Sequence, residues 1–322
     1  MSEIENYLFS SIASILDKQS LKEIQRKNLN LSKNYKLRKQ NVFLDDETRL
    51  AYIASRLPAT YNVYKYVFNQ IKSFLPHLNI KSVLDLGSGP LTALWAVLDV
   101  FEDIKKVHLV EKDFKIIELG KTLLEPLNFL LKKKEIEIEK NDLFKIKNFD
   151  YDVVALSYVV NELKLPLVDR IISKWERSQS KILIFIEPGT KYGFENIKYI
   201  RDKILKKNLK IAAPCPNILP CPMNKNDWCH FYVRVKRTKY HKYIKAASLG
   251  YEDEKFSYLI ISKESSIPYQ SRAIRFTKKS KDEIFLTLCK SGNILTEKIL
   301  RSDGKNFKIA KKTDWGDIFN EI

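Results

Sequence analysis

Hydrophobic positions along residues 80–190 predict strands that alternate with helices. Val83, Leu84 and Leu86 form a short apolar run, which is typical of a strand buried on both faces. Four further strands are predicted, at residues 107–110, 134–139, 151–157 and 182–186. Residues at helical spacing separate these runs, beginning at Leu91 after the first strand. The alternation indicates an α/β fold with a Rossmann-like, largely parallel sheet.

The residues before this sheet predict a helical N-terminal extension at residues 1–76. Apolar residues at helical spacing indicate helices over residues 7–21, 46–57 and 59–74, and Pro58 is expected to end the second. Residues 22–45 are polar and basic, so we expect a loosely packed arm there.

The end of the chain follows a different pattern. Short apolar segments at residues 273–277, 284–289, 294–300 and 307–310 alternate with glycine turns, which predicts a small, barrel-like β module over residues 266–322. The sheet domain then covers residues 77–265 and includes a Cys-rich, basic insertion at residues 205–245.

The turn after the first strand indicates the class of ligand. It reads Gly87-Ser88-Gly89-Pro90, without the third glycine of a dinucleotide fingerprint or the Gly-Lys-Ser/Thr of a phosphate loop. Asp85 at the strand end suits a cationic amino-acid group, while Gly87, Ser88 and Gly89 let an adenosine lie close. The stretch resembles the first motif of class I S-adenosylmethionine (SAM) methyltransferases.

Two more acidic residues stand where such a cofactor needs them. Glu111 ends the second strand, about 20 residues beyond the turn, where an acid accepts hydrogen bonds from both ribose hydroxyls. Asp142 follows the third strand and is placed to accept from an adenine amino group, and Leu143 to cover the ring. The three acids, in order at three strand ends, predict a SAM site.

The catalytic residues stay unknown from the sequence. The fourth and fifth strands are followed by Ser157–Glu162 and Glu187–Thr190, and neither segment holds an Asp/Asn-Pro-Pro-aromatic motif or a cysteine nucleophile. Asn161, Glu162 and Glu187 are polar enough to position a substrate, but no residue is identified as a general base.

Four cysteines form the second strong pattern. Cys215, Cys221 and Cys229 lie in a proline-rich segment, and Cys289 lies in the predicted β module. Prolines break regular structure there and free the sulfurs to converge. Four thiolates hold either zinc or a [4Fe–4S] cluster, and this spacing chooses neither. His230 is an awkward replacement for a sulfur because it adjoins Cys229.

The charge of the chain predicts an anionic partner. The net charge is +18, and residues 191–250 hold fourteen Lys or Arg against three acids. Basic and aromatic residues interleave at residues 231–245, as on RNA-facing surfaces. No run approaches the roughly 20 apolar residues that span a bilayer, so no membrane partner is expected. The acidic first residues lack signal- or transit-peptide composition, which predicts a bacterial cytoplasmic location.

Several segments together make a family resemblance specific. The chain resembles the methyltransferase-like family of small-ribosomal-subunit assembly factors, known from mitochondria and alphaproteobacteria. The matching segments, between about residues 50 and 317, are Arg56–Tyr61, Leu84–Pro90, Glu187–Thr190, Ala213–Pro216, Asp227–Phe231, Glu252–Tyr258 and Trp315–Asp317. The resemblance implies a class I methyltransferase domain that acts on the small subunit. It also implies a [4Fe–4S] cluster on Cys215, Cys221, Cys229 and Cys289.

Two functions remain open at this point. The protein is either a SAM-dependent methyltransferase of small-subunit rRNA or a non-catalytic assembly factor, with a structural zinc or iron–sulfur site, that binds this RNA. Intact SAM-site residues favour the first, and the absent catalytic signature favours the second. A monomer is expected.

Overall fold

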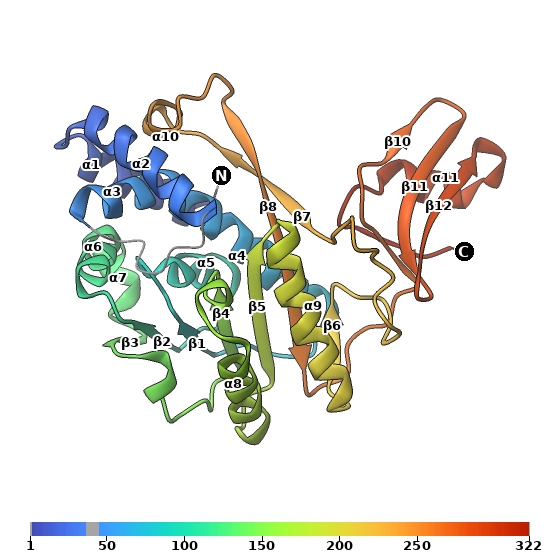
Figure 1. The fold of residues 1–322 in the computed structure, drawn as a ribbon, viewed down its shortest axis with the longest axis horizontal. Helices are drawn as coiled ribbons and strands as arrows, with labels where there is room; N and C mark the ends of the chain where they lie inside the picture. Colours follow the sequence, from blue (N-terminus) through green and yellow to red (C-terminus); the bar gives the residue numbers. More distant parts are fainter. Residues whose placement is uncertain (1, 37–44, 322) are drawn as a thin grey trace. The chain divides into compact units, whose positions relative to one another are not determined.

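The computed structural model describes residues 2–36 and 45–321. These residues form two compact units. The first comprises residues 1–69, 78–183 and 233–254, and the second comprises residues 70–77, 184–232 and 255–322. Eight strands belong to one sheet with the order β3-β2-β1-β4-β5-β8-β6, and β7 pairs with β8 (Figure 1).

The parallel strands of the first unit form the part of the sheet that the sequence predicts most directly. They are β1 (Ser82–Leu86), β2 (Lys106–Glu111), β3 (Glu135–Lys140) and β4 (Val153–Ser157). β1 pairs in parallel with both β2 and β4, and β2 pairs in parallel with β3. Nearly every residue of β1, β2 and β4 is buried, which explains their continuous apolar runs.

Helices follow these strands, as in other α/β folds. They are α5 (Thr92–Val100), α6 (Phe114–Leu124), α7 (Asn128–Leu131) and α8 (Leu165–Arg177). Asp113 caps α6 by accepting a hydrogen bond from the Ile116 amide at 2.9 Å. Helix α8 begins with Pro166 in its first turn, where the missing N–H costs nothing.

The N-terminal extension is helical, and the predicted loose arm is wrong over its first part. The helices are α1 (Glu3–Leu16), α2 (Leu21–Lys36), α3 (Asp46–Ser55) and α4 (Leu57–Phe74). Ile24 and Asn28, one turn apart on α2, are both buried, and this face holds the polar segment as a helix. The rest of the predicted arm, residues 37–44, lies outside the described residues. Pro58 lies in the first turn of α4.

The remaining strands of the sheet come from later in the chain. They are β5 (Ile182–Pro188), β6 (Lys210–Ala213), β7 (Phe231–Lys236) and β8 (Tyr251–Ser262). Helix α9 (Lys191–Lys206) follows β5, and helix α10 (Lys239–Ile244) follows β7. β6 runs antiparallel to β8.

The predicted C-terminal β module is present, with two corrections. Its strands are β9 (Ser271–Ala273), β10 (Lys278–Lys279), β11 (Glu283–Lys290), β12 (Asn293–Leu300) and β13 (Ile318–Phe319). The strand predicted at residues 273–277 is not formed beyond Ala273, where β9 ends. The segment predicted as a strand at residues 307–310 is instead helix α11 (Lys305–Lys312). Phe307 and Ala310, three apart, are its buried residues, a helical spacing that four residues are too few to distinguish from a strand.

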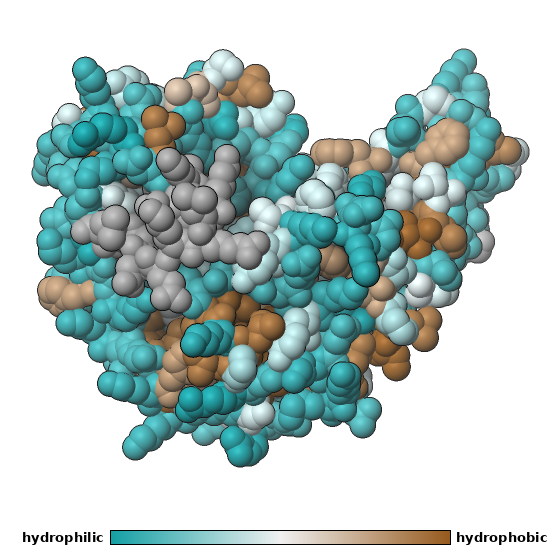
Figure 2. Space-filling view, viewed as in Figure 1, coloured by the Kyte–Doolittle hydropathy of each residue, from teal (hydrophilic) through white to brown (hydrophobic). Residues whose placement is uncertain are grey.

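The predicted fold class is confirmed: this is an α/β protein with a parallel-rich, Rossmann-like sheet. The domain boundaries predicted at residues 76/77 and 265/266 stay predictions. The face shown in Figure 2 is mainly hydrophilic, with scattered apolar patches. Within the described residues, no helix has both the length and the apolar character of a membrane span.

Candidate functional site

A cavity of about 550 Å³ lies at the C-terminal ends of the parallel strands. Ligands of open α/β sheets bind in this position. Four of the six predicted cofactor-binding residues line it, namely Gly87, Gly89, Glu111 and Asp142. The other lining residues are Tyr52, Val110, Lys112, Asp113, Asn141, Leu143, Phe144, Ser157, Tyr158, Val159, Glu162 and Leu163. The structure therefore brings together the ends of β1, β2, β3 and β4.

The glycine turn needs both glycines for conformation, and Gly87 also for space. Gly87 has φ +85° and Gly89 has φ +53°, both in the region that favours glycine. A Cβ added at Gly87 would lie 2.4 Å from Val159 Cγ2, which is too close for any side chain. The Gly87 and Ser88 amides donate to the Val110 carbonyl oxygen at 2.8 and 3.0 Å, and so fix the turn against β2.

Glu111 is tied to the same turn by its carboxylate. Its Oε2 accepts from the Gly89 amide at 2.9 Å, and its Oε1 accepts from the Lys112 and Asp113 amides at 2.7 and 3.0 Å. These bonds orient the carboxylate at the wall of the cavity. Carboxylate oxygens have lone pairs for further donors, so ribose hydroxyls remain acceptable partners.

Asp85 lies beneath the turn and does not line the cavity. Its side chain is fully buried, and Oδ1 accepts from the Tyr64 hydroxyl at 2.7 Å. Oδ2 has no hydrogen-bond partner among the described residues. Burial and, to a smaller extent, the nearby Glu111 raise the pKa of Asp85 to about 7, against the lowering by the Tyr64 hydrogen bond. A buried acceptor without a partner fits a cationic ligand group that completes the site.

The other two predicted residues differ in exposure. Ser88 is buried, does not line the cavity, and its Oγ has no partner in the described part of the chain. Asp142 is exposed, lines the cavity, and accepts from the Phe144 amide at 2.9 Å, which starts a short 3₁₀ turn. This bond holds the loop after β3 against the cavity, where Leu143 also lies.

Sequence reasoning missed the aromatic residues of this cavity. Tyr158, directly after β4, has φ +60°, which is strained for a bulky residue and is often found at functional sites. The Arg56 guanidinium lies 5.9 Å from the centre of its ring. Arg56 also donates to both Glu254 carboxylate oxygens, at 2.8 and 3.1 Å. A strained backbone angle leaves no mark in the sequence.

The polar candidates after β4 and β5 have different surroundings. Glu162 lines the cavity, and burial raises its pKa, with Lys112 opposing the shift. Glu187 is fully buried and accepts from the Asn196 side chain at 3.2 Å. Glu162 is therefore the acid that could take a proton from a cavity-bound ligand, whereas Glu187 is part of the internal packing.

The four cysteines come together in the second unit. Cys215, Cys221, Cys229 and Cys289 line one small cavity of about 50 Å³, together with Phe194, Met223 and Ile274. The first three come from the segment between β6 and β7, and the fourth comes from β11. All four are free thiols in the structure. The structure therefore brings the four cysteines together, as the prolines around the first two predict.

Arg201 of α9 stabilises this arrangement. It is buried, and its Nε donates to the Cys215 sulfur at 3.3 Å. Its Nη2 donates to the carbonyl oxygens of Asn217 and Leu219, which fixes the loop between the first two cysteines. A buried guanidinium beside the sulfurs favours a centre with net negative charge.

The donor set fits a metal centre. Burial and neighbouring cysteines raise the pKa of Cys215, Cys229 and Cys289, that of Cys289 to about 12, while Arg201 opposes the shift at Cys215. Four thiolates therefore need a cation between them. Among the described residues, no three cysteine sulfurs lie within 4.8 Å of one another.

The basic residues after the cysteines are largely paired with acids. Arg234 donates to both Asp253 carboxylate oxygens, at 2.8 and 2.9 Å. Arg237 and Lys245 both contact Glu252, at 3.0 and 2.7 Å. The free positive charge expected of this segment is smaller than its composition indicates, because the acids that pair with it lie 7 to 19 residues later in the chain, on β8.

A second cationic surface lies on α8. A groove of about 390 Å³ is lined by Arg170, Lys174 and Arg177 together with Phe144 and Phe149. None of these cations forms an ion pair among the described residues. Burial lowers the pKa of Lys174, and the positive charges of Arg170 and Lys147 lower it further. Phe144 also lines the 550 Å³ cavity, so the two sites adjoin.

Comparison with known proteins identifies relatives across most of the chain. Residues 46–320 match the family model described as mitochondrial small ribosomal subunit Rsm22. The chain is 24% identical, over 289 residues, to the human protein described as ribosome assembly protein METTL17, mitochondrial. The aligned residues cover 84% of this chain and 62% of that protein. The chain thus spans less than two thirds of this relative's length.

Solved structures with similar folds are methyltransferases. Magnesium protoporphyrin IX methyltransferase from Synechocystis, with bound S-adenosylhomocysteine, is 13% identical, with a TM-score of 0.42, over 74% of this chain and all of that one. TrmK from M. capricolum is 12% identical, with a TM-score of 0.36, over 62% of this chain and 69% of that one.

The predicted bacterial cytoplasmic location is wrong. The matched family and the human relative are both mitochondrial by name. The prediction rested on the composition of the first residues, which the chemistry of the fold does not set.

Proposed function

The chain belongs to the mitochondrial small ribosomal subunit Rsm22 family, and from this we propose that it is a SAM-binding assembly factor of the small ribosomal subunit. In this proposal Asp85, Gly87, Ser88, Gly89, Glu111 and Asp142 bind SAM, and Cys215, Cys221, Cys229 and Cys289 bind a [4Fe–4S] cluster. The partner is small-subunit rRNA, bound by a monomer.

The observation that carries the SAM proposal is the unpaired Oδ2 of Asp85 beneath a glycine turn at the mouth of a 550 Å³ cavity. The ammonium group of SAM would supply the missing donor, and the ribose would lie against Glu111. A cationic ligand also lowers the cost of keeping Asp85 ionised in a buried place.

The cluster is supported by the donor set itself. Four sulfurs around one cavity, with Arg201 beside them, hold a negatively charged centre without any further ligand. Such a cluster would fix the segment between β6 and β7 to β11. Structural zinc is the alternative, and metal analysis distinguishes the two.

Methyl transfer to rRNA is the second candidate function. It is favoured by Glu162, an acid of raised pKa that lines the cavity. In that case the methyl group of SAM passes to a nucleotide, and Glu162 takes the proton that this nucleotide loses. In the non-catalytic alternative, bound SAM only stabilises the RNA-binding shape.

The test compares cells that lack the gene with cells that carry wild-type, Glu162→Gln or Glu111→Ala protein. Methylated nucleotides are mapped in small-subunit rRNA, and assembled subunits are measured by sedimentation. A methyl mark that needs Glu162 supports catalysis. Assembly that needs Glu111 but not Glu162 supports the non-catalytic role. If neither assembly nor methylation changes without the gene, both functions are wrong.

A further inference from the structure

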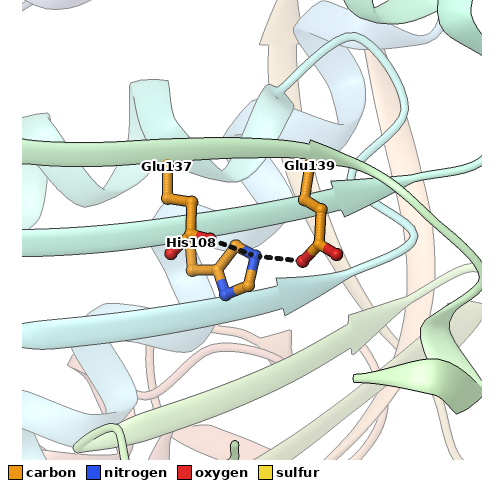
Figure 3. Close-up of side chains that lie close together, drawn as sticks. All are labelled: His108, Glu137 and Glu139. Atoms are coloured by element: carbon orange, nitrogen blue, oxygen red, sulfur yellow. Dashed lines mark hydrogen bonds and ion pairs between the residues drawn. The ribbon is translucent and has the colours of Figure 1, made fainter. Parts of the chain in front are cut away.

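A second cluster of metal-ligating side chains lies away from the cysteines, on strands β2 and β3. His108 Nε2 lies 2.9 Å from a Glu139 oxygen and 3.6 Å from a Glu137 oxygen (Figure 3). His108 and Glu137 are partners in the parallel register, and Glu139 follows two residues later on the same face of β3. Within the described residues, this is the group of three that brings its ligand atoms within 4.8 Å of one another.

We propose that His108, Glu137 and Glu139 bind a divalent metal ion at the edge of the sheet. Metal–nitrogen and metal–oxygen bonds of about 2.0–2.2 Å place neighbouring ligands of a tetrahedral ion about 3.4 Å apart. The two measured separations, 2.9 and 3.6 Å, lie on either side of this value. One imidazole and two carboxylates suit a first-row ion such as Mn²⁺ or Zn²⁺, with water completing the coordination.

Groups outside the cluster orient the buried His108 and the partly exposed Glu139. The Tyr151 hydroxyl lies 3.1 Å from His108 Nδ1, the ring nitrogen that faces away from the glutamates. The Asn141 side-chain amide donates to Glu139 Oε1 at 2.6 Å, which leaves Oε2 toward the histidine. Metal-binding histidines and carboxylates are usually held in this way by outer partners.

The charge balance around the cluster also calls for a cation. On the same face of β3, Glu135 pairs with Lys106. Among the described residues, neither Glu137 nor Glu139 pairs with a lysine or arginine. A divalent ion would neutralise both carboxylates at once.

The ion would also link the sheet edge to the cavity. Among the described strands, β3 is the last of this sheet and pairs with β2 alone. Asn141, which donates to Glu139, lines the cavity beside Asp142. An ion on both strands would hold the outer wall of the cavity in place. Metal binding itself does not depend on the proposed function.

Manganese is the probe because it prefers oxygen and nitrogen ligands and leaves thiolates to softer metals. The full chain, isolated anaerobically, is titrated with Mn²⁺, and free Mn²⁺ is followed by its electron paramagnetic resonance signal. We expect one ion per chain. Glu139→Gln and His108→Gln should each weaken binding at least tenfold, whereas Glu135→Gln, on the same strand face, should bind as wild type does.

Thermal unfolding with and without Mn²⁺ checks that each variant is folded. If His108→Gln does not fold, Glu137→Gln replaces it, because the Glu137 side chain is half-exposed and its loss should also weaken Mn²⁺ binding. Wild-type protein that leaves all Mn²⁺ free at millimolar concentration would overturn the proposal. So would Glu139→Gln protein that binds Mn²⁺ as tightly as wild type, because the cluster would then be only a cross-strand hydrogen-bonded pair.

Discussion

Asp85 has one carboxylate oxygen bonded to Tyr64 and one without a partner among the described residues. Keeping this buried carboxylate ionised therefore lowers the stability of the ligand-free protein. The pKa of Asp85 is raised from 3.8 to about 7 by burial. The native state therefore holds a proton between about pH 4 and pH 7 that the unfolded chain has released. Stability from this residue falls as pH rises through that window.

Asp85→Asn should remove this dependence while keeping an oxygen for the Tyr64 hydroxyl. Without SAM, we expect the variant to equal wild type near pH 4 and to exceed it by about 2–4 kcal/mol at pH 7.5 and above, from 1.36 kcal/mol per pKa unit. Urea unfolding of both proteins across pH 4–8 measures the difference. Parallel stability profiles would show that Asp85 is not the buried, proton-binding group.

Single residues also show where sequence reasoning succeeds and where it stops. Asp85, Glu111 and Asp142 stand at predictable strand ends, because strand patterns locate those ends. The strained Tyr158 and the pairing of Arg237 with Glu252 could not be predicted. Both depend on contacts between residues distant in the chain, which no local pattern records.

Helix α8 offers a different surface for the proposed RNA binding from the one that the sequence predicts. Its Arg170, Lys174 and Arg177 are one or two turns apart and line a groove that Asp169 also lines. None of these three cations forms an ion pair among the described residues. The segment first favoured for this role holds Arg234 and Arg237 in ion pairs with residues of β8. Unpaired cations contribute more to phosphate binding because no existing ion pair has to be broken.

Reversing all three α8 charges to glutamate should weaken binding of small-subunit rRNA and flatten its salt dependence. Each lost phosphate contact lowers the slope of log K against log salt by about 0.7–0.9, so the triple variant should lose about 2. The matched comparison is Arg234→Glu, Lys236→Glu and Arg237→Glu. If only this second triple reduces affinity, the RNA surface lies on β7, as the sequence predicted.

Elements with long patterns were predictable, whereas short ones were not. Strand β5 buries six consecutive residues, and its apolar run leaves no alternative. Helix α11 presents only Phe307 and Ala310 inward, so a short strand fitted the sequence equally well. The core of the module decides the outcome, since both side chains pack with Ile284, Leu286 and Leu288 of β11.

At the scale of the molecule, the cysteine site joins segments that lie 60 or more residues apart. Cys289→Ser should lose the cluster and loosen the C-terminal module together. We expect brown anaerobic wild-type protein with about four irons per chain, and a colourless variant with new protease cuts between about residues 262 and 280. Thr296→Ser, on the exposed face of β12, is the control.

The metal content of the wild-type and Cys289→Ser proteins distinguishes the alternatives. One zinc per wild-type chain and no iron would replace the cluster by a structural zinc and keep the link between the segments. Unchanged metal content in the Cys289→Ser protein would show that β11 contributes no ligand.

The most direct test of the central claim is calorimetric titration with SAM. Wild-type protein should bind one SAM per chain. Glu111→Ala and Asp85→Ala should each weaken binding by about 1–3 kcal/mol, the cost of losing a charged hydrogen-bond partner. Glu102→Ala, an exposed acid away from the cavity, should leave affinity unchanged. Wild-type protein that releases no heat with millimolar SAM would contradict the claim that this cavity binds the cofactor.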